Sequence, residues 1–371
     1  MQLIATCAFG LEKLVYDELK KLGLWVIKTE DGRVTFEGDD LALVRANLWL
    51  RCADRVQIKV GEFRATTFDE LFDQVNALPW ENYINVSDAF PVDAVSVKSM
   101  LHSEPAIQSI TKKSIVKRLQ QKYGTELLPE NSGVQYQIMV KSNKDDFVVT
   151  IDSSGDSLHK RGYRMKTNEA PMKETLAAAI ITLSGWTPDR TLVDPFCGSG
   201  TICIEAALMA HNMAPGLKRT FAFQKWPWIS QENIQKAYAE AREAYKPDAK
   251  FRIYGFDIDA DVLTMAGKNA GNAGFNNLNF KRSDFAELDW SKFENCTFIT
   301  NPPYGERLEE IATVEKMYHD LGKKFKETVG CSMFLITAHE KFQHFFGRVA
   351  DKNRKLFNGG IKCYLFSYLS K

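Results

Sequence analysis

The stretch Asp194-Pro195-Phe196-Cys197-Gly198-Ser199-Gly200 stands between a short strand-like segment, 191–193, and a segment with helical spacing, 201–211. Glycines at a strand-to-helix turn let the backbone approach a ligand, and the helix N-terminus presents free N–H groups. A dinucleotide fingerprint requires GxGxxG, but Cys203 occupies the position of the third glycine. The turn therefore predicts a nucleotide-like ligand and disfavours a dehydrogenase.

Strand and helix patterns alternate on both sides of this turn. Strands are expected at 191–193, 252–256, 278–281, 297–300 and 333–337, and helices at 174–183, 201–211, 262–273 and 317–328. Two final strands around Asn358-Gly359-Gly360 read as an antiparallel hairpin. The pattern predicts an α/β fold with a parallel, doubly wound, Rossmann-like sheet closed by that hairpin.

Polar side chains follow three of these predicted strands. A carboxylate at Asp257 could accept both hydroxyls of a ribose, and Asp284 could meet an adenine ring. Asn301-Pro302-Pro303-Tyr304 follows the next strand. The Asn301 and Pro302 carbonyls could accept hydrogen bonds from an exocyclic amine, and the prolines stiffen the loop. The Tyr304 ring offers a face on which a splayed-out base can stack.

The chain before residue 166 predicts two smaller units. Residues 1–62 show a strand–helix–strand–strand–helix–strand order, which is typical of a ferredoxin-like unit. Residues 63–165 contain a helix at 107–123 and strands at 135–140 and 147–151, separated by a polar turn at 142–146. The predicted domains are therefore 1–62, 63–165 and 166–371. The aromatic stretch 221–228 is compatible with core packing or with a lip over the active site.

Composition sets further bounds. The 371 residues carry 48 Lys and Arg against 47 Asp and Glu, a net charge of +1, which excludes a histone-like polycation but not local basic patches. The seven cysteines form no CxxC pair, so neither a zinc site nor a disulfide framework is expected, and a reducing cytoplasm fits. No segment reads as a signal peptide or a membrane span.

Two basic clusters predict contacts with RNA phosphates. The first cluster contains Lys98, Lys112, Lys113, Lys117, Arg118 and Lys122 against one acid, Glu104. The second contains Lys160, Arg161, Arg164 and Lys166.

Six motifs together carry a resemblance to a known family. They are CAFGLEKLVYDELKKLG at 7–23, LHKRGYR at 158–164, APMKETLAAAI at 170–180, DPFCGSGTICIEAA at 194–207, FDID at 256–259 and NPPYGERL at 301–308. The chain resembles the THUMP-domain class I S-adenosylmethionine (SAM)-dependent RNA methyltransferases. It is most similar to the bacterial family that makes N2-methylguanosine in large-subunit (23S) ribosomal RNA, including the N-terminal half of the fused RlmL-type enzymes.

The resemblance implies a ferredoxin-like unit, a THUMP domain whose family profile can begin near residue 45, and a Rossmann-like methyltransferase domain. It implies SAM as cofactor, structured RNA as partner, and no metal, membrane or obligatory protein partner. The cofactor residues implied are Lys173, Thr175, Asp194, Pro195, Phe196, Cys197, Gly198, Ser199, Gly200, Thr201, Asp257, Ile258, Asp284 and Phe285, beside Pro171 and Met172. The catalytic residues implied are Asn301, Pro302, Pro303 and Tyr304.

Several alternatives stay open at this point. Transfer RNA is an alternative to ribosomal RNA, because THUMP domains also serve tRNA enzymes. The same NPPY loop suits N6 of adenine in DNA or a glutamine amide in a protein, although the predicted RNA-binding units argue against both. A non-catalytic THUMP assembly factor is the alternative from a different class, and the intact motifs argue against it.

Overall fold

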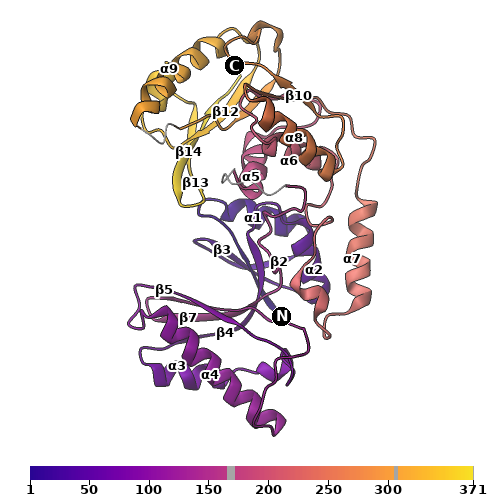
Figure 1. The fold of residues 1–371 in the computed structure, drawn as a ribbon, viewed down its shortest axis with the longest axis vertical. Coiled ribbons are helices and arrows are strands. Elements are labelled where there is room, and N and C mark those ends of the chain that lie inside the picture. The colour runs from indigo at the N-terminus through magenta and orange to yellow at the C-terminus, as the bar shows by residue number, and fades with distance from the viewer. Residues whose placement is uncertain (165–171, 305–307, 371) are drawn as a thin grey trace.

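The computed structural model describes residues 1–164, 172–304 and 308–370. They form two seven-stranded sheets, one in the N-terminal part of the chain and one in the C-terminal part. Figure 1 shows the N-terminal sheet in the lower half of the molecule, with helices above and below it, and the C-terminal sheet in the upper half. The predicted domain boundary at 165/166, together with Lys166 and Pro171, lies outside the described residues.

The first sheet has the strand order β2-β3-β1-β4-β7-β6-β5. Its first half follows the predicted ferredoxin-like order: β1 (Gln2–Thr6), α1 (Glu12–Lys21), β2 (Trp25–Glu30), β3 (Arg33–Glu37), α2 (Asp40–Trp49) and β4 (Arg55–Arg64). β4 runs through the predicted boundary at 62/63 and pairs along its length with β7. The two predicted N-terminal units therefore share one continuous sheet.

The second half of this sheet contains α3 (Phe68–Asn76), β5 (Val92–Val97), α4 (Glu104–Tyr123), β6 (Ile138–Asn143) and β7 (Asp146–Asp152). The predicted polar turn at 142–146 is present but shorter than predicted. The turn consists of Lys144 and Asp145, whose φ angles of 55° and 68° suit a two-residue hairpin. Ser142 belongs to β6, where its hydroxyl donates to the Ser96 hydroxyl at 3.0 Å. The hydrogen-bond partner of this hydroxyl lies on the neighbouring strand β5, which the composition of the segment cannot reveal.

The second sheet has the order β10-β9-β8-β11-β12-β14-β13. Its strands are β8 (Leu192–Asp194), β9 (Ile253–Asp257), β10 (Asn279–Arg282), β11 (Thr297–Thr300), β12 (Ser332–Thr337), β13 (Lys352–Asn358) and β14 (Ile361–Tyr368). β8 to β12 are parallel, and β14 pairs antiparallel with both β12 and β13. This confirms the predicted doubly wound sheet with a closing hairpin.

The helices of this domain are α5 (Glu174–Ser184), α6 (Thr201–Ala210), α7 (Gln231–Glu243), α8 (Ala260–Ala273), α9 (Leu308–Phe325) and α10 (Phe342–Phe346). α9 begins at residue 308, whereas the helix was predicted from 317. Val314, Tyr318, Leu321 and Phe325 are all buried, so the apolar stripe extends further towards the N-terminus than predicted. None of the helices in the described ranges has the length and apolar character that crossing a membrane requires.

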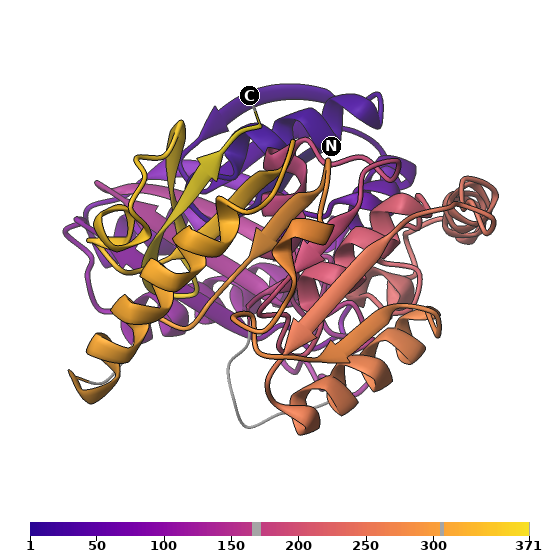
Figure 2. The same ribbon diagram turned by 90° about the horizontal axis from the view of Figure 1, so that it is seen from above.

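The insertion between α6 and β9 ties the two halves of the molecule together. The Arg45 guanidinium on α2 donates to both carboxylate oxygens of Glu240 on α7, at 2.7 and 2.6 Å. The Trp226 ring stacks on the Tyr136 ring with a centroid distance of 5.0 Å. Figure 1 shows α7 extending from the upper domain to the level of α2, and Figure 2 shows it end-on at the rim. The aromatic stretch 221–228 therefore packs in the core and is not a lip over the active site.

Candidate active site

A cavity of about 700 Å³ lies at the carboxyl ends of the central strands of the second sheet. The strand order reverses there, between β8 and β11, and such a switch point leaves a crevice for a ligand. The described residues that line it are Met172, Pro195, Phe196, Gly198, Asp257, Ile258, Ser283, Asp284, Phe285, Asn301, Pro302, Pro303, Tyr304, Thr313, Met317, Asn358 and Ile361. The glycine turn, both acidic strand ends and the loop 301–304 therefore meet at one cavity.

The backbone of the glycine turn needs its glycines. Gly200 has a φ of +82°, and a Cβ there would lie 2.9 Å from the Phe280 ring. Gly198 has a φ of +52°, but a Cβ there would meet no atom within 4 Å. The Gly198 N–H donates to Asp257 Oδ2 at 2.9 Å. The turn is thus held to the end of β9 while open space remains beside Gly198.

Asp194 is buried beneath this turn. Its Oδ1 accepts hydrogen bonds from the Thr300 hydroxyl at 2.7 Å and from the Phe196 N–H at 3.1 Å. Burial raises the pKa of Asp194 to about 7, although both hydrogen bonds act in the opposite direction. Asp194 does not line the cavity, so it shapes the turn and joins it to β11.

The two predicted acidic residues lie on the cavity wall beside an aromatic pair. Asp257 Oδ1 accepts the Asp259 N–H at 3.1 Å, and Asp284 Oδ1 accepts the Ala286 N–H at 2.9 Å. The Phe196 and Phe285 rings lie 5.0 Å apart between their centroids. This end of the cavity combines carboxylate acceptors with apolar ring surface, which suits a ribose joined to a flat base.

The loop 301–304 is held by two tyrosines. The Tyr304 hydroxyl donates to Asn301 Oδ1, and the Tyr318 hydroxyl donates to the Pro303 carbonyl at 2.9 Å. Burial raises the pKa of Tyr304, which keeps its proton on the hydroxyl. A phenol donates only to an acceptor, so this contact orients the carbonyl oxygen of Asn301. The sequence predicted a stacking role for Tyr304 but not this second role.

Seven predicted cofactor residues do not line the cavity. They are Lys173, Thr175, Asp194, Cys197, Ser199, Gly200 and Thr201, which lie behind the turn or at the start of α5. Arg164 connects these segments, donating to the Glu174 carboxylate at 2.8 Å, the Ser199 hydroxyl at 3.1 Å and the Thr201 hydroxyl at 2.9 Å. Its guanidinium is therefore engaged inside the protein, which argues against its predicted role as an RNA ligand.

The prediction that Arg161 contacts RNA was wrong. Arg161 is only 3% exposed, and its guanidinium donates to the carbonyls of Leu158 and Arg51 at 2.7 and 2.6 Å. Its Nε also lies 3.5 Å from Glu205 Oε1. A phosphate cannot reach a side chain buried in this way. The arginines of the LHKRGYR motif therefore form contacts inside the junction between the two parts of the molecule rather than on its surface.

The members of the first basic cluster also differ in whether they form ion pairs. Lys112 pairs with Glu130, and Arg118 pairs with Glu81, lowering the pKa of that carboxyl to about 2. Lys160 is exposed and pairs with Asp156 at 2.6 Å. The exposed members for which no ion pair with a described residue occurs are Lys98, Lys113 and Lys117. Among the predicted RNA-binding residues, these three are therefore the best candidates for contacts with RNA phosphates.

Five lining residues were not predicted as site residues, and one of them, Ser283, directly follows β10. Thr313 and Met317 come from α9, and Asn358 and Ile361 come from the tip of the β13–β14 hairpin. The sequence indicated Asn358 only as part of a turn. No spacing rule places a hairpin tip beside the loop 301–304, because that proximity depends on the strand order of the sheet.

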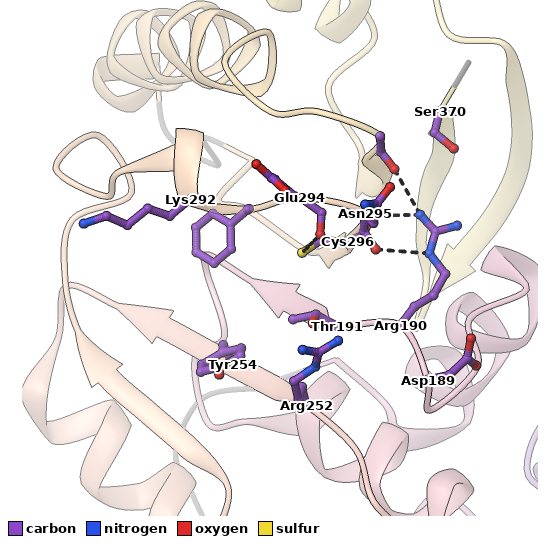
Figure 3. Close-up of a pocket in the computed structure, with 12 residues that line it drawn as sticks. Asp189, Arg190, Thr191, Arg252, Tyr254, Lys292, Glu294, Asn295, Cys296 and Ser370 are labelled. Atoms are coloured by element: carbon purple, nitrogen blue, oxygen red, sulfur yellow. Dashed lines mark hydrogen bonds between the residues drawn. The ribbon is translucent and has the colours of Figure 1, made fainter.

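A second cavity, of about 800 Å³, lies at the opposite, amino-terminal edge of the same strands. Figure 3 shows Arg190 in it, donating to the carbonyls of Asn295, Cys296 and Gly330 at 3.1–3.4 Å. These contacts join the loops before β11 and β12. Arg190 is therefore structural, and the predicted site residues do not line this cavity. No cluster of His, Cys, Asp and Glu within the described ranges could hold a metal ion.

Family models match three segments of the chain. The RMKL-like methyltransferase domain matches residues 161–367, the RlmL ferredoxin-like domain residues 2–57, and the THUMP domain residues 65–152. The first of these covers more than half of the chain. The chain belongs to this family of SAM-dependent RNA methyltransferases.

Similar proteins agree with this family. The protein named "Putative RNA methyltransferase YpsC" of Bacillus subtilis is 45% identical over 100% of this chain and 96% of its own length. The "Ribosomal RNA large subunit methyltransferase K/L" of Psychromonas ingrahamii is 35% identical over 97% of this chain. This chain spans about half the length of the K/L relatives. The solved structure of SMU.472, a putative methyltransferase complexed with SAH, is 46% identical, covers 100% of this chain and 98% of its own, and superposes with a TM-score of 0.94.

The cavity of this methyltransferase fits its cofactor, SAM. The open space beside Gly198 admits a ligand to the backbone of the turn, and Asp257 offers carboxylate oxygens next to it. Phe196, Ile258 and Phe285 provide apolar wall beside Asp284. These are the donor and acceptor types that an amino-acid portion, a ribose and an adenine require.

The raised pKa of Asp194 predicts a pH-dependent stability difference. Because the folded pKa of about 7 lies above the usual value of 3.8, the wild-type protein loses stability as the pH rises between these values. Asp194→Asn keeps an acceptor oxygen without the charge. Thermal or urea unfolding without cofactor should show the variant more stable by about 2–4 kcal/mol at pH 8, with the difference vanishing near pH 4. If the stability difference between Asp194→Asn and wild type does not change with pH, the pKa of Asp194 is not raised in the folded protein.

Proposed function

We propose that this chain transfers a methyl group from SAM to the N2 amine of a guanosine in large-subunit (23S) ribosomal RNA. The observation that carries the proposal is that the loop 301–304 and the glycine turn meet at one cavity. The names of the K/L relatives favour ribosomal RNA as the substrate. We further propose the domain division 1–62, 63–165 and 166–371 and a location in the cytoplasm.

The mechanism depends on the residues that hold the amine. SAM, when bound, supplies a methyl group that its sulfonium makes electrophilic. An exocyclic amine of a base is a weak nucleophile, because its lone pair is delocalised into the ring. Asn301 Oδ1 already accepts from Tyr304, and no further hydrogen bond to it from a described residue occurs, so its second lone pair can accept an N–H of the amine. With the Pro302 carbonyl as a second acceptor, the loop orients the amine and draws it towards tetrahedral geometry.

The residues that would contact SAM are proposed from the same lining of the cavity. We assign the ribose hydroxyls to Asp257, the adenine side to Asp284, Ile258 and Phe285, and the methionine portion to the open side of Gly198. Asp194, Ser199, Gly200 and Thr201 act indirectly by shaping the turn. The target base enters from the side of Tyr304, where Met317 and Ile361 add apolar surface.

The direct test of the function is nucleoside mass spectrometry. A strain that lacks the gene should lose N2-methylguanosine from 23S rRNA, and purified protein with SAM should restore it at one mapped position. Loss from the tRNA fraction would favour the tRNA alternative, and N6-methyladenosine as product would contradict guanine specificity. Binding of RNA without any methyl transfer would support the non-catalytic assembly factor.

Replacing Asp257 tests the cofactor assignment. Asp257→Ala should weaken SAM binding by about 1.5–3 kcal/mol, because a charged acceptor is lost. Asp257→Asn should lose less, since an amide oxygen can still accept the Gly198 N–H. Isothermal titration calorimetry would measure both. Asp261→Ala, an equal charge change at an exposed position in the first turn of α8, is the control and should bind normally. If Asp257→Ala binds SAM with unchanged affinity, the assignment of the ribose hydroxyls to Asp257 is wrong.

The RNA surface can be tested on α4. Lys113→Glu/Lys117→Glu should weaken RNA binding and flatten its dependence on salt, because fewer counterions are released, while SAM affinity is kept. The control, Lys236→Glu/Lys250→Glu, makes the same charge change at exposed sites on and beyond α7. Figure 1 places α4 at the far end of the molecule from the second sheet, so an RNA that touches both must be large. If both double substitutions change RNA affinity equally, the RNA does not bind along α4.

Replacing Asn301 tests the mechanism. Asn301→Ala should reduce single-turnover methyl transfer at saturating SAM by about 100-fold or more, because an acceptor used in the transition state is lost. SAM affinity should stay within about twofold of wild type. Asn301→Asp keeps an acceptor for the amine and should retain part of the activity. Rapid transfer by Asn301→Ala would show that this loop is not the catalytic element.

A further inference from the structure

The tip of the β13–β14 hairpin forms part of the wall of the active-site cavity. Asn358, the last residue of β13, and Ile361, the first of β14, both line it. Further along β14, the Cys363 thiol lies 4.0 Å from the Tyr304 hydroxyl. The hairpin is therefore packed directly against the loop that holds the reacting amine.

Asn358 differs from its neighbours on this wall. Apart from the glycine turn, the acidic strand ends and the loop 301–304, the described residues that line the cavity are mostly apolar: Met172, Met317 and Ile361. Asn301 is oriented by Tyr304, and Thr313 carries only a hydroxyl. The Asn358 side chain also interacts with the Tyr304 hydroxyl. Because an amide carries two N–H donors and a carbonyl acceptor, Asn358 still offers both kinds of group to a bound base.

The two groups of an amide match one base edge better than the other. Beside its N2 amine, guanine presents the N1–H donor and then the O6 acceptor, so an amide can make two hydrogen bonds to it. Beside its N6 amine, adenine presents the N1 acceptor and then a carbon-bound hydrogen, so an amide makes one. A base extruded into a pocket is read by such contacts to its Watson–Crick edge.

The hairpin is also held in place from outside its own domain. The Arg354 guanidinium on β13 donates to the Gly10 carbonyl at 2.6 Å. The Phe9 and Phe357 rings meet edge to face at 6.2 Å, and a Cβ on Gly10 would lie 3.0 Å from the Lys355 carbonyl. Figure 1 shows the lower end of β13 against the N-terminal domain. A hairpin anchored in this way can present Asn358 at a constant position.

We propose that Asn358 is a specificity-determining residue that reads N1–H and O6 of the target guanine while the loop 301–304 holds its N2 amine. This inference rests on the proposed function, and it names a residue that sets the preference for guanine over other bases carrying a reactive amine.

The first experiment compares three variants on rRNA from a strain lacking the gene. Asn358→Ala should lower kcat/KM for the RNA by about 10- to 100-fold, as expected for the loss of a bidentate base contact. Asn358→Asp keeps the acceptor for N1–H and loses the donor to O6, so it should fall between Asn358→Ala and wild type. Asn353→Ala, on the exposed part of the same strand, should match wild type. SAM affinity should be unchanged in all three.

The decisive experiment measures base preference. A synthetic RNA fragment around the mapped position is made with guanine or with 2-aminopurine, which keeps the amine but lacks N1–H and O6. Wild type should prefer guanine by about 10- to 100-fold, and Asn358→Ala should largely lose this preference. A merely structural role would lower both rates equally and leave the ratio unchanged.

The outcomes separate the two proposals. If wild type makes no N2-methylguanosine in any RNA, the proposed function and this inference both fail. If wild type makes it and Asn358→Ala keeps the wild-type preference for guanine, only this inference is overturned.

Discussion

The ion pair between Arg161 and Glu205 joins the two halves of the molecule. Both side chains are buried, and the guanidinium also donates to the carbonyl of Arg51, at the end of the first domain's second helix. Removing two charges from water costs several kcal/mol each, which only close pairing and further hydrogen bonds offset. Because Glu205 lies on α6 of the methyltransferase domain, the pair ties that domain to the N-terminal one. The orientation of the two sheets is thereby set at a point close to the cofactor turn.

Both walls of the active-site cavity are connected to this junction or to the domain beyond it. Arg164, three residues after Arg161, holds Ser199 and Thr201, which lie behind the glycine turn that forms one wall. On the other wall, the β13–β14 hairpin is anchored to Gly10 through Arg354. The N-terminal domain and the cavity are therefore held at a constant distance and orientation. Such positioning suits a reaction in which the protein contributes mainly by alignment of the reacting groups.

Much of the methyltransferase sheet could be predicted, because its parallel strands read as short apolar segments that alternate with amphipathic helices. The errors have physical causes. Ser142 was assigned to a turn because its hydroxyl partner lies on another strand. The helix containing Val314 was begun too late, because a run of charges obscured its buried stripe. Arg161 was assigned to RNA because a charge in a sequence does not reveal whether a buried carboxylate faces it.

The sequence by itself determined the chemistry available at the site. Glycines that require positive φ, carboxylates after strands and the Asn301–Tyr304 loop are local features, and the carboxyl ends of parallel strands meet at one edge whatever the loops between them do. Only the tertiary structure decided which cations of the described residues form ion pairs, which residues merely shape the turn, and that Asn358 lines the same cavity as Asn301. Burial and pairing depend on segments that are distant in the chain, and an arginine reads the same in the sequence whether it faces water or a buried carboxylate.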